Sequence, residues 1–285
     1  MGRNFWVLYK LSILQSIVLG IIQGVAEFFP ISSSGHLVAI PFFFGWDYPP
    51  LYFTVTVHFA TLLAVLTVFY RDIYRIIKAV ALSIFKKKWR RTYDFKTGIF
   101  IMISTIPAAL AGYFLDDIFE GFFSKPLAVA GFLLLTALIL WGSEKIGTRA
   151  VPKTEFGFLS ALIVGIGQAL AIFPGISRSG TTISFARFFG IKRREAVRFS
   201  FLLSIPIILG SFLFEISRSA EAVFRNGTAV LWSLIAGLIS AYLAGYFAIK
   251  YLMYLVRKKN LNVFALYCIC LSAAIFIFYI IKINI

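Results

Sequence analysis

The sequence holds few of the residues that build disulfide frameworks and catalytic clusters. Its 285 residues include two Cys, two His and 12 Asp or Glu, and only 14% of the chain is charged. Cys268 and Cys270 lie within one apolar run, point in different directions on a helix and cannot pair, so we interpret them as small apolar side chains. No P-loop or dinucleotide fingerprint is present. The apolar stretch after Lys10 has no small-residue cleavage site, and we expect no cleaved signal.

Apolar residues, by contrast, make up 60% of the chain, and the mean hydropathy is +0.89. A soluble domain of this size could not bury so much apolar surface. A helix needs roughly 20 apolar residues to cross the hydrocarbon core, or about 17 at the short end. Six runs approach or exceed that length: 51–70, 97–115, 126–143, 199–214, 229–249 and 261–281. We therefore expect an all-α integral membrane protein with about six transmembrane helices.

The net charge of +16 could indicate a nucleic-acid partner, but the position of the charges indicates a membrane. Connectors rich and poor in Lys and Arg alternate along the chain, with 21 basic residues on one side and three on the other. This alternation is the positive-inside pattern. We expect a multi-pass protein of the bacterial cytoplasmic membrane with its basic connectors in the cytoplasm, in contact with anionic lipid and with no nucleic acid.

The sequence also contains an internal repeat. Residues 23–36 read QGVAEFFPISSSGH and residues 168–181 read QALAIFPGISRSGT, with seven identities in fourteen positions at a shift of 145. Three crossings follow each copy, so the second half enters the membrane in the opposite orientation, as in many transporters. We expect one membrane domain made of two inverted repeats, residues 1–145 and 146–285.

The two repeated segments do not read as ordinary crossings. The first is interrupted by Gly20, Gly24 and Pro30, and the stretches 37–45 and 181–190 are too short to span. Non-helical backbone at membrane depth must be buried in protein or line a wet cavity. We predict two re-entrant helix hairpins, at 11–45 and 156–190, with Gly35 and Gly180 adopting the unusual backbone angles at the turns.

Polar residues gather at these predicted turns. Glu27 lies in an apolar segment, and an ionisable residue within the membrane is a candidate functional residue; Gln23, four residues earlier, shares its helix face. The alternative is a buried Glu that pairs with a cation to lock two helices. Ser32, Ser33 and Ser34 follow. Hydroxyl and N–H groups at a helix N-terminus form an anion site, and we interpret the three serines in this way. The alternative is that they are simple helix caps.

Arg178 occupies the position in the second copy that Ser33 occupies in the first. Arginine binds phosphate oxygens in a bidentate manner, although a salt bridge to Glu27 without any substrate would also explain it. His58, alone in a crossing, we interpret as a packed or hydrogen-bonded residue. An Arg and a divalent cation would neutralise a diphosphate, and a Ser or His would attack phosphorus or activate water.

Two longer motifs carry a family resemblance. The first, E/Q-x-x-x-E followed by P-x-S-S/T-S/T-G-H, comprises Gln23, Glu27, Pro30, Ser32, Ser33, Ser34, Gly35 and His36. The second, P-G-x-S-R-S-G, comprises Pro174, Gly175, Ser177, Arg178, Ser179 and Gly180. The whole chain resembles the bacterial undecaprenyl-diphosphate phosphatases, also called bacitracin-resistance proteins. Many members have Glu at the position of Gln23, which weakens any role that needs a carboxylate there.

The resemblance implies hydrolysis of undecaprenyl diphosphate to undecaprenyl phosphate and inorganic phosphate, which recycles the lipid carrier for cell-wall synthesis. It also implies resistance to bacitracin, dependence on Mg²⁺ or Ca²⁺, and an active site open to the outer face. Glu27, together with Gln23, is the candidate metal ligand. The alternative function is a flippase that carries the polyprenyl phosphate through the same cleft, and a homodimer also stays open.

The predicted site follows from the two motifs. Glu27, Arg178 and either Ser33 or His36 as nucleophile are the candidate catalytic residues. The candidate substrate-binding residues surround them at both turns: Gln23, Ser32, Ser34, Gly35, Ser177, Ser179, Gly180 and Thr181.

Overall fold

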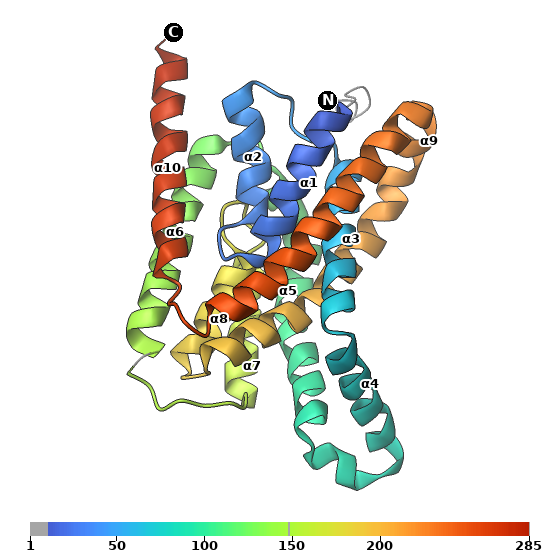
Figure 1. Cartoon of the computed structure of the whole chain (residues 1–285), viewed down its shortest axis with the longest axis vertical. Coiled ribbons are helices and arrows are strands. Elements are labelled where there is room, and N and C mark those ends of the chain that lie inside the picture. The colour runs from blue at the N-terminus through green and yellow to red at the C-terminus, as the bar shows by residue number, and fades with distance from the viewer. Residues whose placement is uncertain (1–10, 148, 285) are drawn as a thin grey trace.

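The computed structural model describes residues 11–147 and 149–284, and this part of the chain is helical without a β-strand. In chain order the helices are α1 (Ile13–Phe28), α2 (Ser33–Phe44), α3 (Leu51–Val68), α4 (Tyr70–Phe85), the 3₁₀ helix η1 (Lys87–Arg91), α5 (Tyr93–Glu120), α6 (Pro126–Gly147), α7 (Phe158–Leu170), α8 (Arg178–Phe188), α9 (Arg193–Leu255) and α10 (Asn262–Ile283). Figure 1 shows their arrangement.

Six segments are long and apolar enough to cross a membrane, and they coincide with the six predicted runs. They are Leu51–Val68, Tyr93–Leu115, Pro126–Gly147, Arg193–Glu215, Val230–Leu255 and Asn262–Ile283. The prediction of an all-α integral membrane protein is confirmed.

Helix α9 supplies two of these spans because it folds back on itself. A straight helix would place Phe201 and Gly245 about 66 Å apart at 1.5 Å per residue. The ring of Phe28 nevertheless lies 5.2 Å from the ring of Phe201 and packs directly against Gly245. The two arms of α9, Arg193–Glu215 and Val230–Leu255, therefore run side by side, as Figure 1 shows.

Small residues let α1 pack closely on the second arm of α9. Gly20 and Gly24 face Gly237, Ala241 and Gly245 with no room for a side chain between the backbones. Close approach of this kind is how membrane helices gain van der Waals contact, since lipid offers no hydrophobic drive for their association. The contact fixes the depth at which α1 ends.

The two pairs of short helices are broken at the repeated motifs. Helix α1 begins with a capping box formed by Ser12 and Gln15, and it runs through Gly20 and Gly24 without interruption. The predicted break at these glycines is wrong, because their role is packing. The chain leaves the helix only at Phe29, and α2 begins at Ser33. Figure 1 shows the α1–α2 pair and the α7–α8 pair approaching each other from opposite ends of the molecule.

The backbone at the two breaks differs from the prediction. The residues with positive φ are Ser32, at 68°, and Gly175, at 106°, whereas Gly35 and Gly180 lie within the first turns of α2 and α8. Gly35 is instead needed for close approach, because a Cβ there would lie 3.3 Å from the Cα of Gly175. The predicted division into inverted repeats, 1–145 and 146–285, stays a prediction.

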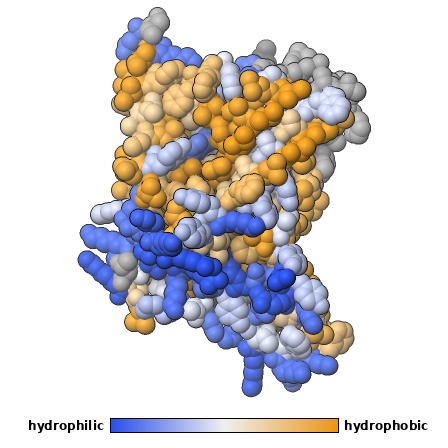
Figure 2. Space-filling view, viewed as in Figure 1, coloured by the Kyte–Doolittle hydropathy of each residue, from blue (hydrophilic) through white to orange (hydrophobic). Residues whose placement is uncertain are grey.

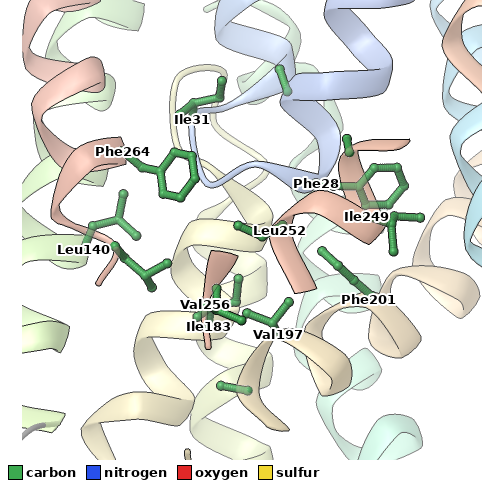
Figure 3. Packing of buried hydrophobic residues seen from close by; sticks show 14 of the residues in the cluster. Phe28, Ile31, Leu140, Ile183, Val197, Phe201, Ile249, Leu252, Val256 and Phe264 are labelled. Carbon is green, nitrogen blue, oxygen red and sulfur yellow. The ribbon is translucent and has the colours of Figure 1, made fainter. Parts of the chain in front are cut away.

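A continuous apolar core surrounds the breaks. Phe28 and Ile31 of the first pair, Ile183 of α8, and Phe201 and Ile249 of α9 belong to one buried cluster, shown in Figure 3. In Figure 2 hydrophilic side chains form a band across the middle of the molecule and continue to the end that carries α4, and apolar side chains cover most of the opposite half of this face. Helix α4 and η1 contribute Lys and Arg residues to that end. The molecule thus has one strongly basic end.

The packing of α1 on α9 predicts opposite effects for two Gly→Ala substitutions. A Cβ at Gly24 would lie 2.5 Å from the carbonyl oxygen of Ala241, whereas a Cβ at Gly131 of α6 would meet nothing within 4 Å. Gly24→Ala should lower the unfolding temperature in detergent by several degrees, at a cost of about 1–3 kcal/mol. Gly131→Ala should leave it unchanged or raise it. Equal behaviour of the two variants would contradict this packing.

Candidate active site

The two chain breaks meet in the interior of the molecule. Ser179 Oγ donates a hydrogen bond to the carbonyl oxygen of Phe29, 3.1 Å away. Arg178 Nη2 donates to Glu27 Oε1 at 3.0 Å, which joins residues 151 positions apart. Both contacts run from the second motif to the first, so the structure brings the two motifs into one site.

Glu27 is the most heavily bonded side chain of the site. It is only 6% exposed, and its Oε2 accepts hydrogen bonds from Ser33 Oγ at 2.7 Å and from Gln23 Nε2 at 2.9 Å. Arg178 occupies Oε1 and also donates to the carbonyl oxygen of Ser200 at 3.2 Å. A buried ion pair is tolerated when further hydrogen bonds satisfy both partners in this way.

Serine side chains cap both helices that begin at the site. Ser32 Oγ accepts from the N–H of Gly35 at 3.1 Å, and Ser177 Oγ accepts from the N–H of Gly180 at 3.0 Å. The capping interpretation is therefore correct for Ser32, and Ser177 takes the same role in the second copy. It leaves Ser33 with its hydroxyl directed at Glu27. The N-termini of α2 and α8 both lie at the centre, where their dipoles favour an anion.

A cavity of about 310 Å³ opens beside this centre. Glu27, Ser33, Ser34, Ser177 and Arg178 supply its polar wall. Most of the other lining residues are apolar and come from α1, α2, α3, α5, α9, the α5–α6 connector and the α7–α8 connector: Ala26, Leu37, Leu51, Val55, Ala108, Phe123, Ala171, Ile172, Ile176, Ile207, Ile208 and Phe212. The mixture suits a ligand with a charged head and a hydrocarbon tail.

Several predicted site residues support the cavity without lining it. Ser32, Ser179, Thr181, Gly35, Gly180 and Gln23 are absent from its wall. Gln23 instead bonds Glu27, Thr181 Oγ1 donates to the carbonyl oxygen of Ser177, and Ser179 links the two breaks. Their contribution is to the shape of the two turns.

His36 differs most from its predicted place. Its Nδ1 donates to the carbonyl oxygen of Ser32 at 2.7 Å, and its Nε2 lies 2.7 Å from the hydroxyl of Tyr267 on α10. Its ring also stacks on Tyr267. Because His36 faces α10 and does not line the cavity, the structure places it behind Ser32, where it holds the strained turn. Ser33 is the better placed of the two predicted nucleophiles.

Three cavity residues were missed or discounted at the level of sequence. His58, interpreted as a packed or hydrogen-bonded residue, does donate from Nδ1 to the carbonyl oxygen of Thr54 at 2.8 Å. It also lines the cavity, with Nε2 3.7 Å from Glu27 Oε2. Gln168 and Glu215 also line it. The sequence did carry a signal for Gln168, because it aligns with Gln23 in the internal repeat. Nothing in the local sequence of Glu215 distinguishes it from an ordinary residue of a connector.

The oxygen donors of the site are compatible with a hard divalent cation. Among the described residues no group of three or more His, Cys, Asp or Glu is close enough to hold a metal by itself. Glu27 offers carboxylate oxygens, and the buried Oε1 of the adjacent Gln23 has no hydrogen-bond partner. Mg²⁺ is commonly held by one or two carboxylates together with substrate phosphates, and this donor set fits that arrangement.

Comparisons with known proteins agree on one family. The family model described as bacitracin resistance protein BacA matches residues 16–274. An undecaprenyl-diphosphatase of Methanosphaera stadtmanae is 41% identical over 90% of this chain and 95% of its own length. An undecaprenyl-diphosphatase of Halothermothrix orenii is 42% identical over 90% of this chain and 95% of its own length. An undecaprenyl-diphosphatase of Thermomicrobium roseum is 37% identical over 92% of this chain and 96% of its own length.

The Glu27–Arg178 pair predicts non-additive stability. Arg178→Gln leaves a buried carboxylate without its cation, a loss of about 3–5 kcal/mol. The double variant Glu27→Gln, Arg178→Gln removes both charges and should regain most of that loss. Thermal unfolding of the purified protein in detergent measures both. A double variant less stable than Arg178→Gln alone would show that the pair does not hold the site together.

Proposed function

Because this chain belongs to the BacA family of bacitracin-resistance proteins, we propose that it hydrolyses undecaprenyl diphosphate to undecaprenyl phosphate and inorganic phosphate. The function recycles the lipid carrier and confers resistance to bacitracin. The observation that supports it best is the cavity in which Ser33, Glu27 and Arg178 converge beneath apolar walls. The relatives are diphosphatases, and the flippase alternative has no such support.

Binding follows from the chemistry of the cavity walls. The polyprenyl tail lies along the apolar side, continuous with lipid, and the diphosphate reaches the polar wall. Arg178 and the N–H groups at the starts of α2 and α8 stabilise phosphate oxygens. The guanidinium of Arg178 pairs with Glu27 in the structure. When substrate binds, its N–H groups donate to both the Glu27 carboxylate and the phosphate. The ion pair thus holds Arg178 in place before substrate arrives.

The chemical step is assigned to Ser33 and Glu27. Ser33 Oγ attacks the terminal phosphorus, the bond from that phosphorus to the bridging oxygen breaks, and the Ser33 proton passes to Glu27, 2.7 Å away. Undecaprenyl phosphate leaves. Water then attacks the phosphoserine, the phosphorus–Oγ bond breaks, and Oγ recovers its proton from Glu27 as phosphate is released. A cation held by Glu27, Gln23 and the substrate would neutralise the charge of the diphosphate.

We also propose that the site opens to the outer face of the cytoplasmic membrane. The cavity extends to Leu51, where α3 begins, and to Glu215, where the first arm of α9 ends. These points lie away from the end that carries α4 and η1 (Figure 1). Since basic connectors stay in the cytoplasm, the cavity faces the other side.

The nucleophile is tested with substrate labelled with ³²P in the terminal phosphate. Acid quenching during turnover should trap label on the wild-type protein, and peptide mapping should place it on Ser33. Ser33→Ala should lower kcat by at least about 10³-fold and carry no label. The neighbouring variant Ser34→Ala should still be labelled at Ser33. Full turnover by Ser33→Ala would reject this residue as the nucleophile.

The orientation is tested with single cysteines in a variant whose Cys268 and Cys270 are replaced by Ala. Asp47 lies in the exposed α2–α3 connector and Lys88 in η1. A membrane-impermeant maleimide added to intact cells should label Asp47→Cys, whereas Lys88→Cys should react only after permeabilisation. The reverse pattern would place the site in the cytoplasm.

A further inference from the structure

The repeat places two glutamines, Gln23 and Gln168, at equivalent positions, and their surroundings differ. Gln23 is followed four residues later by Glu27, and its amide N–H₂ donates to that carboxylate at 2.9 Å. Gln168 is followed four residues later by Ile172. The second glutamine therefore has no carboxylate to position, although it is equally buried, at 2% exposure.

Gln168 belongs to the cavity, whereas Gln23 lies behind it. Gln168 and Ile172 both line the cavity, from the hairpin opposite the one that carries Ser33. The Nε2 of Gln168 points at the carbonyl oxygen of Ser104, 3.4 Å away. That carbonyl accepts hydrogen bonds only, so it determines which end of the amide faces it. The other end, Oε1, has no hydrogen-bond partner.

A buried hydrogen-bond acceptor without a donor costs free energy. We therefore ask which group of the reaction could donate to Oε1 of Gln168. The oxygens of an ionised diphosphate are acceptors and would repel Oε1. Arg178 donates to Glu27 and to the carbonyl oxygen of Ser200, and the hydroxyl of Ser33 donates to Glu27. Neither of these two groups is therefore directed at Oε1 of Gln168. In the proposed reaction the water that attacks the phosphoserine is a further donor in the cavity, and it must be held near phosphorus.

The direction of attack agrees with this assignment. In phosphoryl transfer the attacking and leaving oxygens are roughly in line through phosphorus. When Ser33 Oγ is the leaving oxygen, water must approach from the side of phosphorus away from α2. Gln168 is on α7, in the wall supplied by the second hairpin.

We propose that Gln168 is a positioning residue for hydrolysis: its Oε1 accepts a hydrogen bond from the water that attacks the phosphoserine at Ser33. The water oxygen bonds to phosphorus, the phosphorus–Oγ bond breaks, Oγ takes the proton held by Glu27, and both protons of the water leave with phosphate and solvent. This inference rests on the proposed function. It divides the two steps between the repeats, with Gln23 supporting formation of the intermediate and Gln168 supporting its breakdown.

The test compares Gln168→Met with Gln23→Met in the purified full-length protein. Methionine keeps the length of the side chain and removes the amide. With terminally ³²P-labelled undecaprenyl diphosphate, Gln168→Met should lower kcat by about 10–100-fold, and the fraction of labelled protein at steady state should rise. KM should not rise. Gln23→Met should also lower kcat, but with a lower labelled fraction, because it impairs the first step.

The outcomes separate the two levels of the proposal. A wild-type protein that releases no phosphate contradicts the proposed function itself. A wild-type protein that releases phosphate without acquiring label contradicts the phosphoserine step and, with it, this inference. Two results would overturn the role of Gln168 alone, provided that the wild type is labelled. The first is a normal kcat for Gln168→Met. The second is a reduced kcat for this variant without a rise in the fraction of labelled protein.

Discussion

The ion pair between Glu27 and Arg178 is the interaction on which the rest of the site depends. Each charge lies at a chain break deep in a protein that crosses the membrane, and neither would be tolerated there alone. Their contact at 3.0 Å joins the two motifs. The remaining polar groups then take defined roles, since Gln23 and Ser33 complete the shell of Glu27 and the carbonyl of Ser200 completes that of Arg178.

Packing allows the pair to form. Gly35 leaves room for the backbone of Gly175, and Ser32 and Ser177 cap α2 and α8 so that both helices can begin at membrane depth. Backbone groups that would be exposed to lipid are satisfied within the protein. The same arrangement aims two helix N-termini at one point, which provides a place for phosphate before any substrate binds.

Much of this could be predicted from the sequence, and the exceptions have physical reasons. The six spans follow from the length of apolar runs, and the pairing of Glu27 with Arg178 follows from the cost of burying either one. The backbone angles at the breaks could not be predicted from the sequence. Ser32 takes a positive φ, which is usually found at glycine. The direction of His36 depends on Tyr267, 231 residues away, and local sequence carries no information about that contact. His58 is recognised as a site residue only when the cavity is defined, whereas the alignment of Gln168 with Gln23 in the repeat already pointed to Gln168.

The most direct measurement is a structure of the protein with a non-hydrolysable polyprenyl methylenediphosphonate. The account predicts that the terminal phosphonate lies against Ser33 Oγ and the guanidinium of Arg178, with the prenyl chain along the apolar wall of the cavity. A phosphonate bound elsewhere, with Glu27 and Arg178 still paired and out of contact with it, would contradict the account and reduce the ion pair to a structural lock.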